Sequence, residues 1–437
     1  MKIQNISGHY PLHLRPSCSP HECPSWDLLV AAGSEWSQGN ATSALSLAAA
    51  AAAATCEFGG ELCSTLAGMQ FAQMLINVRR LGEARQAVRH TAAMAADPRV
   101  AGIAALLNSR IALTVGDVAE AIDLCSTGLA VVDELRLSPW KPIGNIICAT
   151  NALRSGDVAT MVHHANQLKE DVLFGRDMFA WNSPAWLIVR IAEAEQGRDA
   201  AVPLARELLE SETATRRLLL AEPTSVSFLV RMMLDVHERD IAAPAVAHAT
   251  ALAAENPDIP VLAAGALHAR GLLENDVDLL RQAAEGYGDA WARASVAEDI
   301  ATVLAAQGQP TRQICDQYET AMRTYAAAGA LYDSSRVRSK LRGYNRSMAT
   351  ARFWPSSRIP GLTDTEYTVA KLVSEGLTNA EVAGQMYLSR HTVAFHLRKI
   401  FQKVGAKSRL ELALMWNDLA ERGHAPFGRV PAGRASA

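Results

Sequence analysis

Basic side chains gather close to the C-terminal end of this chain. Arg390, Arg398, Lys399 and Lys403 lie within residues 389–404, a segment without any acidic residue, although the 437-residue chain has a net charge of −3. Guanidinium and ammonium groups bind phosphate oxygens and the base edges that a DNA groove presents. The segment therefore predicts a short basic element that enters a groove of duplex DNA.

Four predicted helix starts position these side chains. Thr363, Thr378 and Ser408 are each followed three residues later by Glu, which predicts three capping boxes. Ser389 is a good N-cap residue for a fourth helix. Glycines follow the first and the third helix, where a left-handed residue ends a helix well. We expect helices over about 364–375, 379–386, 390–404 and 409–422.

The helix expected over 390–404 has two different faces. Val393, Leu397 and Ile400 recur at helical spacing and predict a buried stripe that should not contact bases. The turn at 386–388 has the length that a helix-turn-helix uses between its two helices. In that arrangement the N-terminal half of the second helix meets base edges, and the groups around it meet phosphates.

The candidate DNA contacts follow from this placement. We predict that Arg398, His391 and Phe395 contact base edges. The other candidates lie on the same helix or at the starts of the supporting and final helices. They are Thr378, Asn379, Ser389, Arg390, Thr392, Lys399, Lys403, Lys407, Ser408 and Arg409.

The order of these landmarks resembles the LuxR-type DNA-binding domain. The likeness is carried by Leu362-Thr363…Glu366, Glu375-Gly376-Leu377-Thr378-Asn379, Thr392-Val393…His396-Leu397-Arg398 and Lys403-Val404-Gly405…Ser408-Arg409. The resemblance implies a transcriptional regulator that binds double-stranded DNA. The family usually has Lys or another polar residue where this chain has Ala394. Base contact should therefore depend more on Arg398, with Ala394 and Phe395 available to thymine methyl groups.

The rest of the chain predicts helical hairpins. Residues 25–345 show no strand-like alternation, and turn residues interrupt their helical patterns every 33 to 43 residues or so, as at Gly116-Asp117 and Gly156-Asp157. Hairpins at this period predict a degenerate tetratricopeptide-like α-solenoid. The predicted fold class is thus all-α, a solenoid followed by a four-helix helix-turn-helix domain. Its concave surface would take an effector or a protein partner, neither of which the sequence identifies.

The expected domains differ in charge. We predict an irregular tail (1–24), the repeat domain (25–345), a linker (346–358), the DNA-binding domain (359–424) and a disordered tail (425–437). Residues 340–424 carry 13 basic and 7 acidic side chains, whereas residues 1–339 carry 27 basic and 38 acidic ones. An acidic body would repel DNA, so only the C-terminal module should contact it.

The end of the repeat domain also resembles the segment before the DNA-binding domain of large ATP-dependent LuxR regulators. The residues concerned include 268–273 and 298–301. Such proteins usually begin with an ATPase module, but no Lys follows a Gly anywhere in this sequence, which excludes a GxxxxGK[ST] phosphate loop. We expect no nucleotide cofactor, and an ATPase module in a separate chain remains an open alternative.

Other chemistry finds little support in the sequence. It contains no GxSxG, HExxH or dinucleotide-binding motif, so we expect no enzyme and no cofactor. His13, Cys18, His21 and Cys23 could ligate zinc, but their spacing fits no standard site, and we predict no metal. The seven cysteines, the lack of a secretory signal and the short apolar runs predict a cytoplasmic protein that contacts no membrane.

Several alternatives remain open at this level. The chain could be an interaction scaffold whose helix-turn-helix no longer binds DNA, as Ala394 would allow, or a ligand-gated switch. Leu412, Trp416 and Leu419 on the final helix could form a homodimer contact, which predicts a two-fold symmetric operator, or could pack within the domain. Trp140, Trp181, Trp186 and Trp291 could line a ligand surface or belong to the core.

Overall fold

The computed structural model describes residues 23–54, 60–94, 97–173, 184–349, 359, 361–386 and 388–422, and every regular element within these ranges is helical, as predicted. The helices of the N-terminal part are α1 (Pro24–Gln38), α2 (Ala41–Ala53), α3 (Gly60–Asn77), α4 (Leu81–Met94), α5 (Pro98–Val115), α6 (Val118–Glu134), a 3-10 turn η3 (Ser138–Trp140), α7 (Lys141–Ser155) and α8 (Val158–Leu173).

The chain continues through ten more helices before the C-terminal module. They are α9 (Ala185–Gln196), α10 (Arg198–Leu209), α11 (Glu212–Ala221), α12 (Ser225–Asp235), α13 (Arg239–Glu255), α14 (Pro260–Glu274), α15 (Val277–Gly286), α16 (Ala290–Ala306), α17 (Thr311–Ala327) and α18 (Leu331–Ala349). None of the helices in the described ranges is both long and apolar enough to span a bilayer.

Local capping chemistry sets many of these boundaries. Asp97 and Asp117 accept hydrogen bonds from first-turn N–H groups of α5 and α6. Gly116 and Gly156 end α5 and α7 in the left-handed conformation, with φ of 98° and 84°. These helix ends coincide with the interruptions that the sequence predicted.

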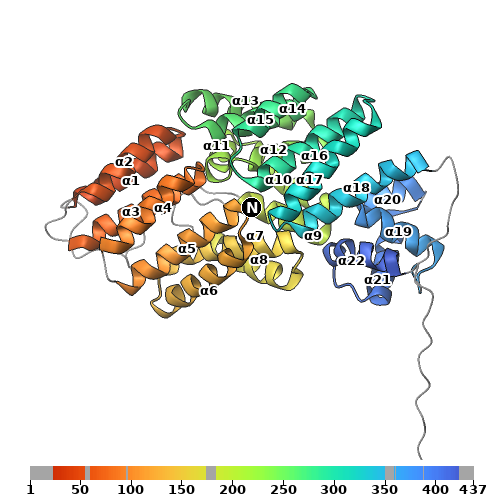
Figure 1. Cartoon of the computed structure of the whole chain (residues 1–437), viewed down its shortest axis with the longest axis horizontal. Helices are drawn as coiled ribbons and strands as arrows, with labels where there is room; N and C mark the ends of the chain where they lie inside the picture. The colour runs from red at the N-terminus through yellow and green to blue at the C-terminus, as the bar shows by residue number, and fades with distance from the viewer. Residues whose placement is uncertain are drawn as a thin grey trace, which may run out of the picture.

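Consecutive helices pack as hairpins, which stack side by side (Figure 1). In the N-terminal part α1 packs on α2, α3 on α4, α5 on α6 and α7 on α8. Helices α1, α3, α5 and α7 also contact one another in that order. This is the arrangement expected of a helical repeat, whereas its tetratricopeptide character remains a prediction.

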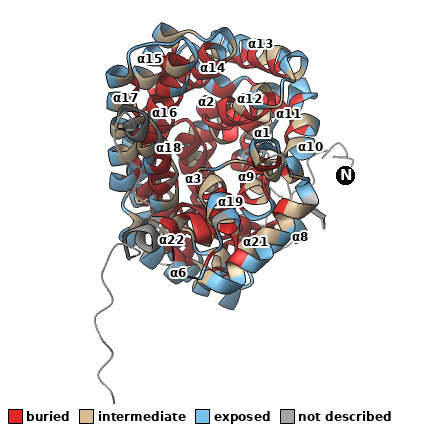
Figure 2. Cartoon of the chain, turned by 90° about the vertical axis from the view of Figure 1, so that its right-hand side faces the viewer, coloured by how far each residue is buried: buried red, intermediate tan, exposed pale blue. Residues whose placement is uncertain are grey.

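The two halves of the repeat domain close on each other. Helix α11 contacts α1, α16 contacts α5, and α18 contacts α7. The side chain of Asn256 accepts a hydrogen bond from the Ala41 N–H and donates one to the Gly39 carbonyl, both at 2.8 Å. Buried residues accordingly fill the middle of the molecule (Figure 2). Contacts therefore cross the middle of the repeat domain, between its first half (α1 to α8) and its second half (α9 to α18).

The core of the repeat domain is one continuous cluster that extends from α1 to α18. Many of its members are alanines without exposed surface, such as Ala292 and Ala301, which let neighbouring helices approach closely. Trp140, Trp186 and Trp291 are buried, as one of the two alternatives predicted. Trp181 lies outside the described residues.

Two predicted domain boundaries differ from the structure. Helix α1 begins at Pro24, preceded by a buried Cys23 that clusters with Cys63, so the irregular tail does not include residue 24. Helix α18 extends to Ala349 and takes the first part of the predicted linker. His13, Cys18 and His21, the remaining linker residues and the tail at 425–437 lie outside the described residues.

The C-terminal module has its own core. Its helices are α19 (Asp364–Ser374), α20 (Asn379–Met386), α21 (Arg390–Val404) and α22 (Arg409–Arg422), within about one residue of the predicted ranges. A hydrophobic cluster separate from that of the repeat domain joins all four. The module docks on the repeat domain through α22, which contacts α9 and α18 (Figure 1).

Candidate nucleic-acid interface

Capping boxes start the first two helices of the module. The Glu366 N–H donates to Thr363 Oγ1 at 3.2 Å, and the Thr363 N–H donates to the Glu366 carboxylate at 2.8 Å. Thr378 and Glu381 exchange the same two bonds at 3.2 and 2.6 Å. Both predicted capping boxes are confirmed, and they hold α19 and α20 in the orientation that supports α21.

The final helix is capped somewhat differently. The Glu411 N–H donates to Ser408 Oγ at 3.1 Å, as predicted, but the Glu411 carboxylate accepts from the N–H of Lys407 rather than from that of Ser408. The return bond thus reaches one residue further back. It fixes the backbone at Lys407, whose side chain is exposed.

Helices α20 and α21 pack as the predicted helix-turn-helix. The Leu388 N–H donates to the Ala383 carbonyl at 2.9 Å and closes the turn between the two helices. Val393, Leu397 and Ile400 are buried against α19 and α20, which confirms the apolar stripe of α21. The opposite side of α21 is consequently the side that the packing leaves uncovered.

That uncovered side carries the main candidates for base contact. The Phe395 side chain is 50% exposed, which is unusual for a large apolar group. Lys399 places its ammonium 4.4 Å from the centre of the Phe395 ring, and Arg398 beside it is exposed. The structure therefore brings Phe395, Arg398 and Lys399 together on one face, and His391 lies on the same helix with a side chain outside the described residues.

The start of α21 combines a cap with an exposed cation. Ser389 Oγ accepts from the Thr392 N–H at 3.1 Å and lies 2.8 Å from Thr392 Oγ1. Arg390 is exposed, and its Nη1 lies 3.9 Å from Asp199 Oδ2 of the repeat domain. Exposed pairs at this distance contribute little energy, so Arg390 can exchange Asp199 for a phosphate.

Lys403 has a partner within the module. Its ammonium donates to the Glu366 carboxylate at 2.6 Å. This hydrogen bond, followed by that of the Thr363 N–H, lowers the pKa of Glu366 to about 2. The same carboxylate thus caps α19 and ties α21 to it, and Lys403 remains partly exposed at the edge of the candidate face.

Several predicted phosphate contacts are more covered than expected. Thr378 and Ser408 are buried because their hydroxyls cap α20 and α22. Asn379 is half-buried, and its Oδ1 is buried without a hydrogen-bond partner. The Thr378 N–H is engaged as well, since it donates to the Glu381 carboxylate at 2.6 Å, so a phosphate would have to displace one of these capping bonds.

Arg409 points toward the repeat domain and away from the exposed face of α21. Its guanidinium donates to the Leu377 carbonyl and lies near Glu193 and Tyr332. Burial is the main cause that lowers its pKa. Its hydrogen bond thus stays within the module, while its guanidinium lies against Gly197 of the repeat domain, where an added Cβ would be 3.0 Å from Nη1.

The apolar residues of α22 divide between two partners. Leu412 and Trp416 are buried in the core of the module, where Trp416 packs 5.2 Å from the ring of Tyr367. Of the two alternatives, packing within the domain is therefore the one that holds for both residues. The Leu419 side chain lies outside the described residues.

The sequence analysis missed the residues of α22 that contact the repeat domain. Leu410 belongs to the core of that domain, and the Ala413 carbonyl accepts from Ser335 Oγ at 3.3 Å. Leu414 occupies the space beside Gly156, where an added Cβ would lie 1.8 Å from Leu414 Cδ1. The signal was a second apolar pair, Leu410 and Leu414, at helical spacing next to the first one.

Comparisons with known proteins agree with this geometry. Residues 360–416 match the family described as bacterial regulatory proteins, luxR family. A protein of Mycobacterium tuberculosis (strain H37Rv) that is named an HTH-type transcriptional regulator is 36% identical over 101 residues, 23% of this chain and 10% of that protein. The DNA-binding transcriptional activator DevR/DosR of the same organism is 38% identical over 61 residues, 14% of this chain and 28% of the activator.

A third relative is the transcription regulator BvgA of Bordetella pertussis, 37% identical over 67 residues, which are 15% of this chain and 30% of BvgA. The chain thus spans between 10% and 30% of the length of these relatives. Together with the arrangement of α19 to α22, the matches identify residues 360–416 as a LuxR-type helix-turn-helix domain.

Proposed function

We propose that this protein is a sequence-specific transcriptional regulator that binds duplex DNA through α21 and senses an effector or a partner through its helical repeats. It acts without catalysis and in the cytoplasm, where bacterial DNA is accessible. The observation that carries the proposal is the exposed face of α21, where Phe395, Arg398 and Lys399 stand opposite a buried stripe.

The predicted contacts divide into two kinds on this face. Arg398, Phe395 and His391 would meet base edges, since a guanidinium binds guanine through two hydrogen bonds and an aromatic ring can contact a thymine methyl group. Arg390, Lys399, Lys403 and Lys407 surround them and would neutralise phosphates.

A sensing role for the repeats is supported by the way the module docks. Arg409 is half-buried against the repeat domain, and Asp199 of that domain lies beside Arg390 at the start of α21. A ligand that changes the repeat domain would act on the DNA-binding face through these contacts, because it would favour either the docked or the separated arrangement.

An interaction scaffold is the second candidate. It is favoured by Ala394, which supplies no polar group in the middle of α21, and by the use of Arg409 as an interdomain contact. The two functions differ in salt dependence, because a protein that neutralises phosphates loses affinity for DNA steeply as salt increases.

The proposal can be tested by in-vitro selection from a random DNA pool with the full-length protein and with Arg398→Ala. Enrichment of one motif by the wild type, lost in Arg398→Ala, is expected. Arg281→Ala is a matched control, since Arg281 is an exposed arginine of α15 that pairs with the neighbouring Asp278. Motif enrichment by the wild type and by the control, with none by Arg398→Ala, would establish sequence-specific binding.

A second selection should use residues 359–424, which contain a core of their own. If only this module enriches a motif, the repeat domain restrains DNA binding in the absence of its effector. If neither protein enriches a motif, the scaffold becomes the better explanation.

A further inference from the structure

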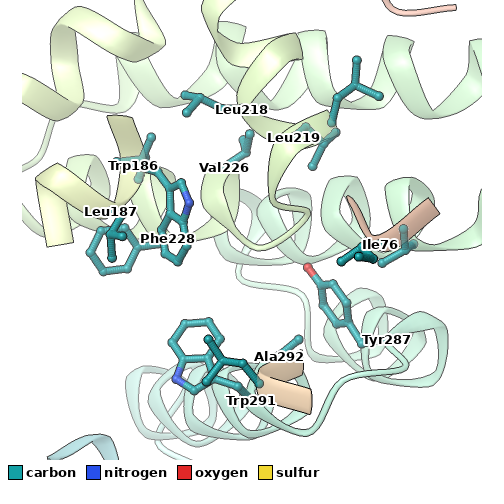
Figure 3. Packing of buried hydrophobic residues seen from close by; sticks show 14 of the residues in the cluster. Ile76, Trp186, Leu187, Leu218, Leu219, Val226, Phe228, Tyr287, Trp291 and Ala292 are labelled. Carbon is teal, nitrogen blue, oxygen red and sulfur yellow. The ribbon is translucent and has the colours of Figure 1, made fainter. Parts of the chain in front are cut away.

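Two cysteine thiols meet inside the repeat domain. Around Trp186, Phe228 and Trp291 the core of this domain consists of packed aromatic and aliphatic side chains (Figure 3). Cys125 of α6 belongs to the same core cluster, and Cys148 of α7 packs against it. Because α6 and α7 contact each other, the two thiols approach across a single helix–helix contact.

The sulfur atoms of these two residues lie close enough to react with each other. Cys125 Sγ is 3.3 Å from Cys148 Sγ, so one thiol donates a hydrogen bond to the other. The sulfurs of a disulfide are about 2.05 Å apart, and an approach of about 1.2 Å would therefore form the bond. Both cysteines are free in this structure. The pair is thus a dithiol placed to form an intramolecular disulfide.

The two thiols differ in exposure. Cys125 is only 2% exposed, and its Sγ also lies 3.6 Å from the Gly144 carbonyl oxygen, to which its thiol can donate. Cys148 is half-buried, so part of it is open to small molecules in the solvent. A dissolved oxidant therefore reaches Cys148 first, and Cys125 acts from inside the protein.

The surroundings of Cys148 favour its thiolate. A hydrogen bond from Cys125 lowers the pKa of Cys148 to about 5. Burial opposes this shift, whereas the interactions with His164 and His163 of α8 support it. The buried Asn145 holds the His164 ring in place, since its Oδ1 lies 3.0 Å from His164 Nδ1. Because the thiolate is the nucleophile of cysteine chemistry, Cys148 is the thiol that attacks.

Cys315 of α17 provides a comparison within the same chain. It is half-buried, as Cys148 is. Its pKa is nevertheless raised, first by burial and then by the charges of Glu319 and Asp316. Similar exposure is thus combined with surroundings that disfavour the thiolate, which makes Cys315 a matched control.

We propose that Cys125 and Cys148 are a redox-sensing pair that hydrogen peroxide converts reversibly into a disulfide. Cys148 is the residue that the oxidant meets, and Cys125 is the residue that resolves the product. Disulfides that form in a reducing compartment are usually transient and serve catalysis or redox sensing. This inference concerns a modification of the repeat domain and goes beyond the proposed binding of DNA.

The reaction has two steps. The Cys148 thiolate attacks one peroxide oxygen, so that an S–O bond forms, the O–O bond breaks, and the hydroxide that leaves takes up a proton to become water. Cys125 then attacks the sulfur of this sulfenic acid. The S–S bond forms, the S–O bond breaks, and the departing hydroxide takes the Cys125 proton. Two electrons pass from the thiols to the peroxide, which is reduced to water, and a dithiol reductant reverses the bond by exchange.

The test is peptide mapping of the full-length protein by mass spectrometry, before and after treatment with a few equivalents of hydrogen peroxide. Free thiols are blocked with N-ethylmaleimide before digestion. Trypsin cleaves after Arg136, so Cys125 and Cys148 lie in separate peptides, 111–136 and 137–154. We expect peroxide to join these two peptides with the loss of two hydrogen atoms, and dithiothreitol to separate them again.

Three results would overturn the proposal. They are an absence of oxidation at Cys148, sulfinic or sulfonic acid at Cys148 without any joined peptides, and a disulfide of Cys148 with a different cysteine or with a second chain.

Variants establish the order of the two steps. Cys125→Ser should leave Cys148 as a sulfenic acid that dimedone traps. The wild type should give roughly tenfold less of this adduct, because its Cys125 consumes the sulfenic acid. Cys148→Ser replaces a half-buried thiol, so this arm does not depend on the folding of Cys125→Ser, and its Cys125 should stay reduced. Oxidation of Cys125 in Cys148→Ser to the same extent as in the wild type would refute the assigned order.

Cys315→Ser is the control and should form the disulfide between Cys125 and Cys148 as the wild type does. Loss of the disulfide in this variant would show that another thiol carries the oxidation. Every arm uses the protein without DNA, so the outcome is independent of the proposed function. A disulfide without any enriched DNA motif would support the redox pair and reject the regulator, and an enriched motif without a disulfide would do the reverse.

Discussion

Arg398 is the residue on which sequence-specific binding should depend most. It is exposed on the same face of α21 as Phe395, and Ala394 offers no polar group beside it. Replacement by alanine should cost on the order of 1–3 kcal/mol on the best DNA site and relax the base preference there. Competition binding with a set of single-base variants of the selected site would measure both effects.

Lys403→Ala provides the contrast on the same helix. Lys403 lies at the edge of the face and already pairs with Glu366. Its loss should therefore weaken binding to all DNA sequences to a similar degree and make the affinity less dependent on salt concentration. If Lys403→Ala lost affinity for some DNA sequences and not for others, the assignment of α21 residues to base contacts and phosphate contacts would be wrong.

Glu366 should make the stability of the module depend on pH. Its pKa in the folded protein is about 2, below the value of about 4.3 in an unfolded chain. A lowered carboxyl pKa stabilises the fold above the unfolded pKa, and this stabilisation is lost as the pH falls toward the folded pKa. Glu366→Gln should therefore lower Tm at pH 7, and the difference from the wild type should shrink between about pH 4 and pH 2.

The control for this measurement is Glu411→Gln. Glu411 also supports a helix start, but its carboxylate accepts from the backbone N–H of Lys407. Glu411→Gln should weaken this backbone hydrogen bond and so shows the general effect of replacing a carboxylate at a helix start. Parallel Tm curves for wild type and Glu366→Gln over the whole pH range would contradict the assigned role of the Lys403 contact.

At the scale of elements, the C-terminal end of α7 packs against the middle of α22. Gly156 has a left-handed φ of 84°, and a Cβ there would collide with Leu414. Gly156→Ala should therefore loosen the docking of the module, which would appear as faster amide hydrogen exchange in α22 and in the facing part of α18.

A second glycine in the left-handed conformation, with free space around it, distinguishes backbone strain from the collision with Leu414. Gly308 has φ of 67° and no atom within 4 Å of an added Cβ. Gly308→Ala should show only the cost of the left-handed conformation. In the double variant Gly156→Ala/Leu414→Ala, amide hydrogen exchange in α22 should slow again, toward the rate measured for Gly308→Ala. No restoration would show that backbone strain alone explains the effect.

At the scale of the whole molecule, Arg79 ties the two halves of the repeat domain together. It follows α3 in the first half, whereas Glu222 and Asp289 belong to the second. The charges of these two acids outweigh the cost of burial and raise the pKa of Arg79 above its ordinary value. Arg79→Met would leave the buried Asp289 and the half-buried Glu222 without this cation, and breaking a buried pair typically costs about 3–5 kcal/mol.

Urea unfolding followed by circular dichroism would measure this loss. Arg270→Met, which removes an arginine from an exposed pair with Glu274 on α14, should leave the unfolding midpoint almost unchanged. Equal midpoints for Arg79→Met and the wild type would mean that apolar contacts alone close the two halves.

The sequence by itself determined the local structure of the DNA-binding module. Capping boxes, helix ends and the buried stripe at Val393, Leu397 and Ile400 were predictable because each depends on residues three or four positions apart. The same reasoning placed the repeat interruptions at Gly116 and Gly156 and indicated an all-α fold.

Only the tertiary structure decided which of several equivalent faces is covered, and by what. Arg409 is an exposed cation by its sequence context, yet the repeat domain covers part of it. Leu412 and Leu414 are both apolar residues of one helix, but the first packs inside the module and the second faces Gly156 of the repeat domain. The closure that joins Arg79 to Glu222 and Asp289 spans more than a hundred residues of chain, and no local pattern encodes a contact between such distant segments.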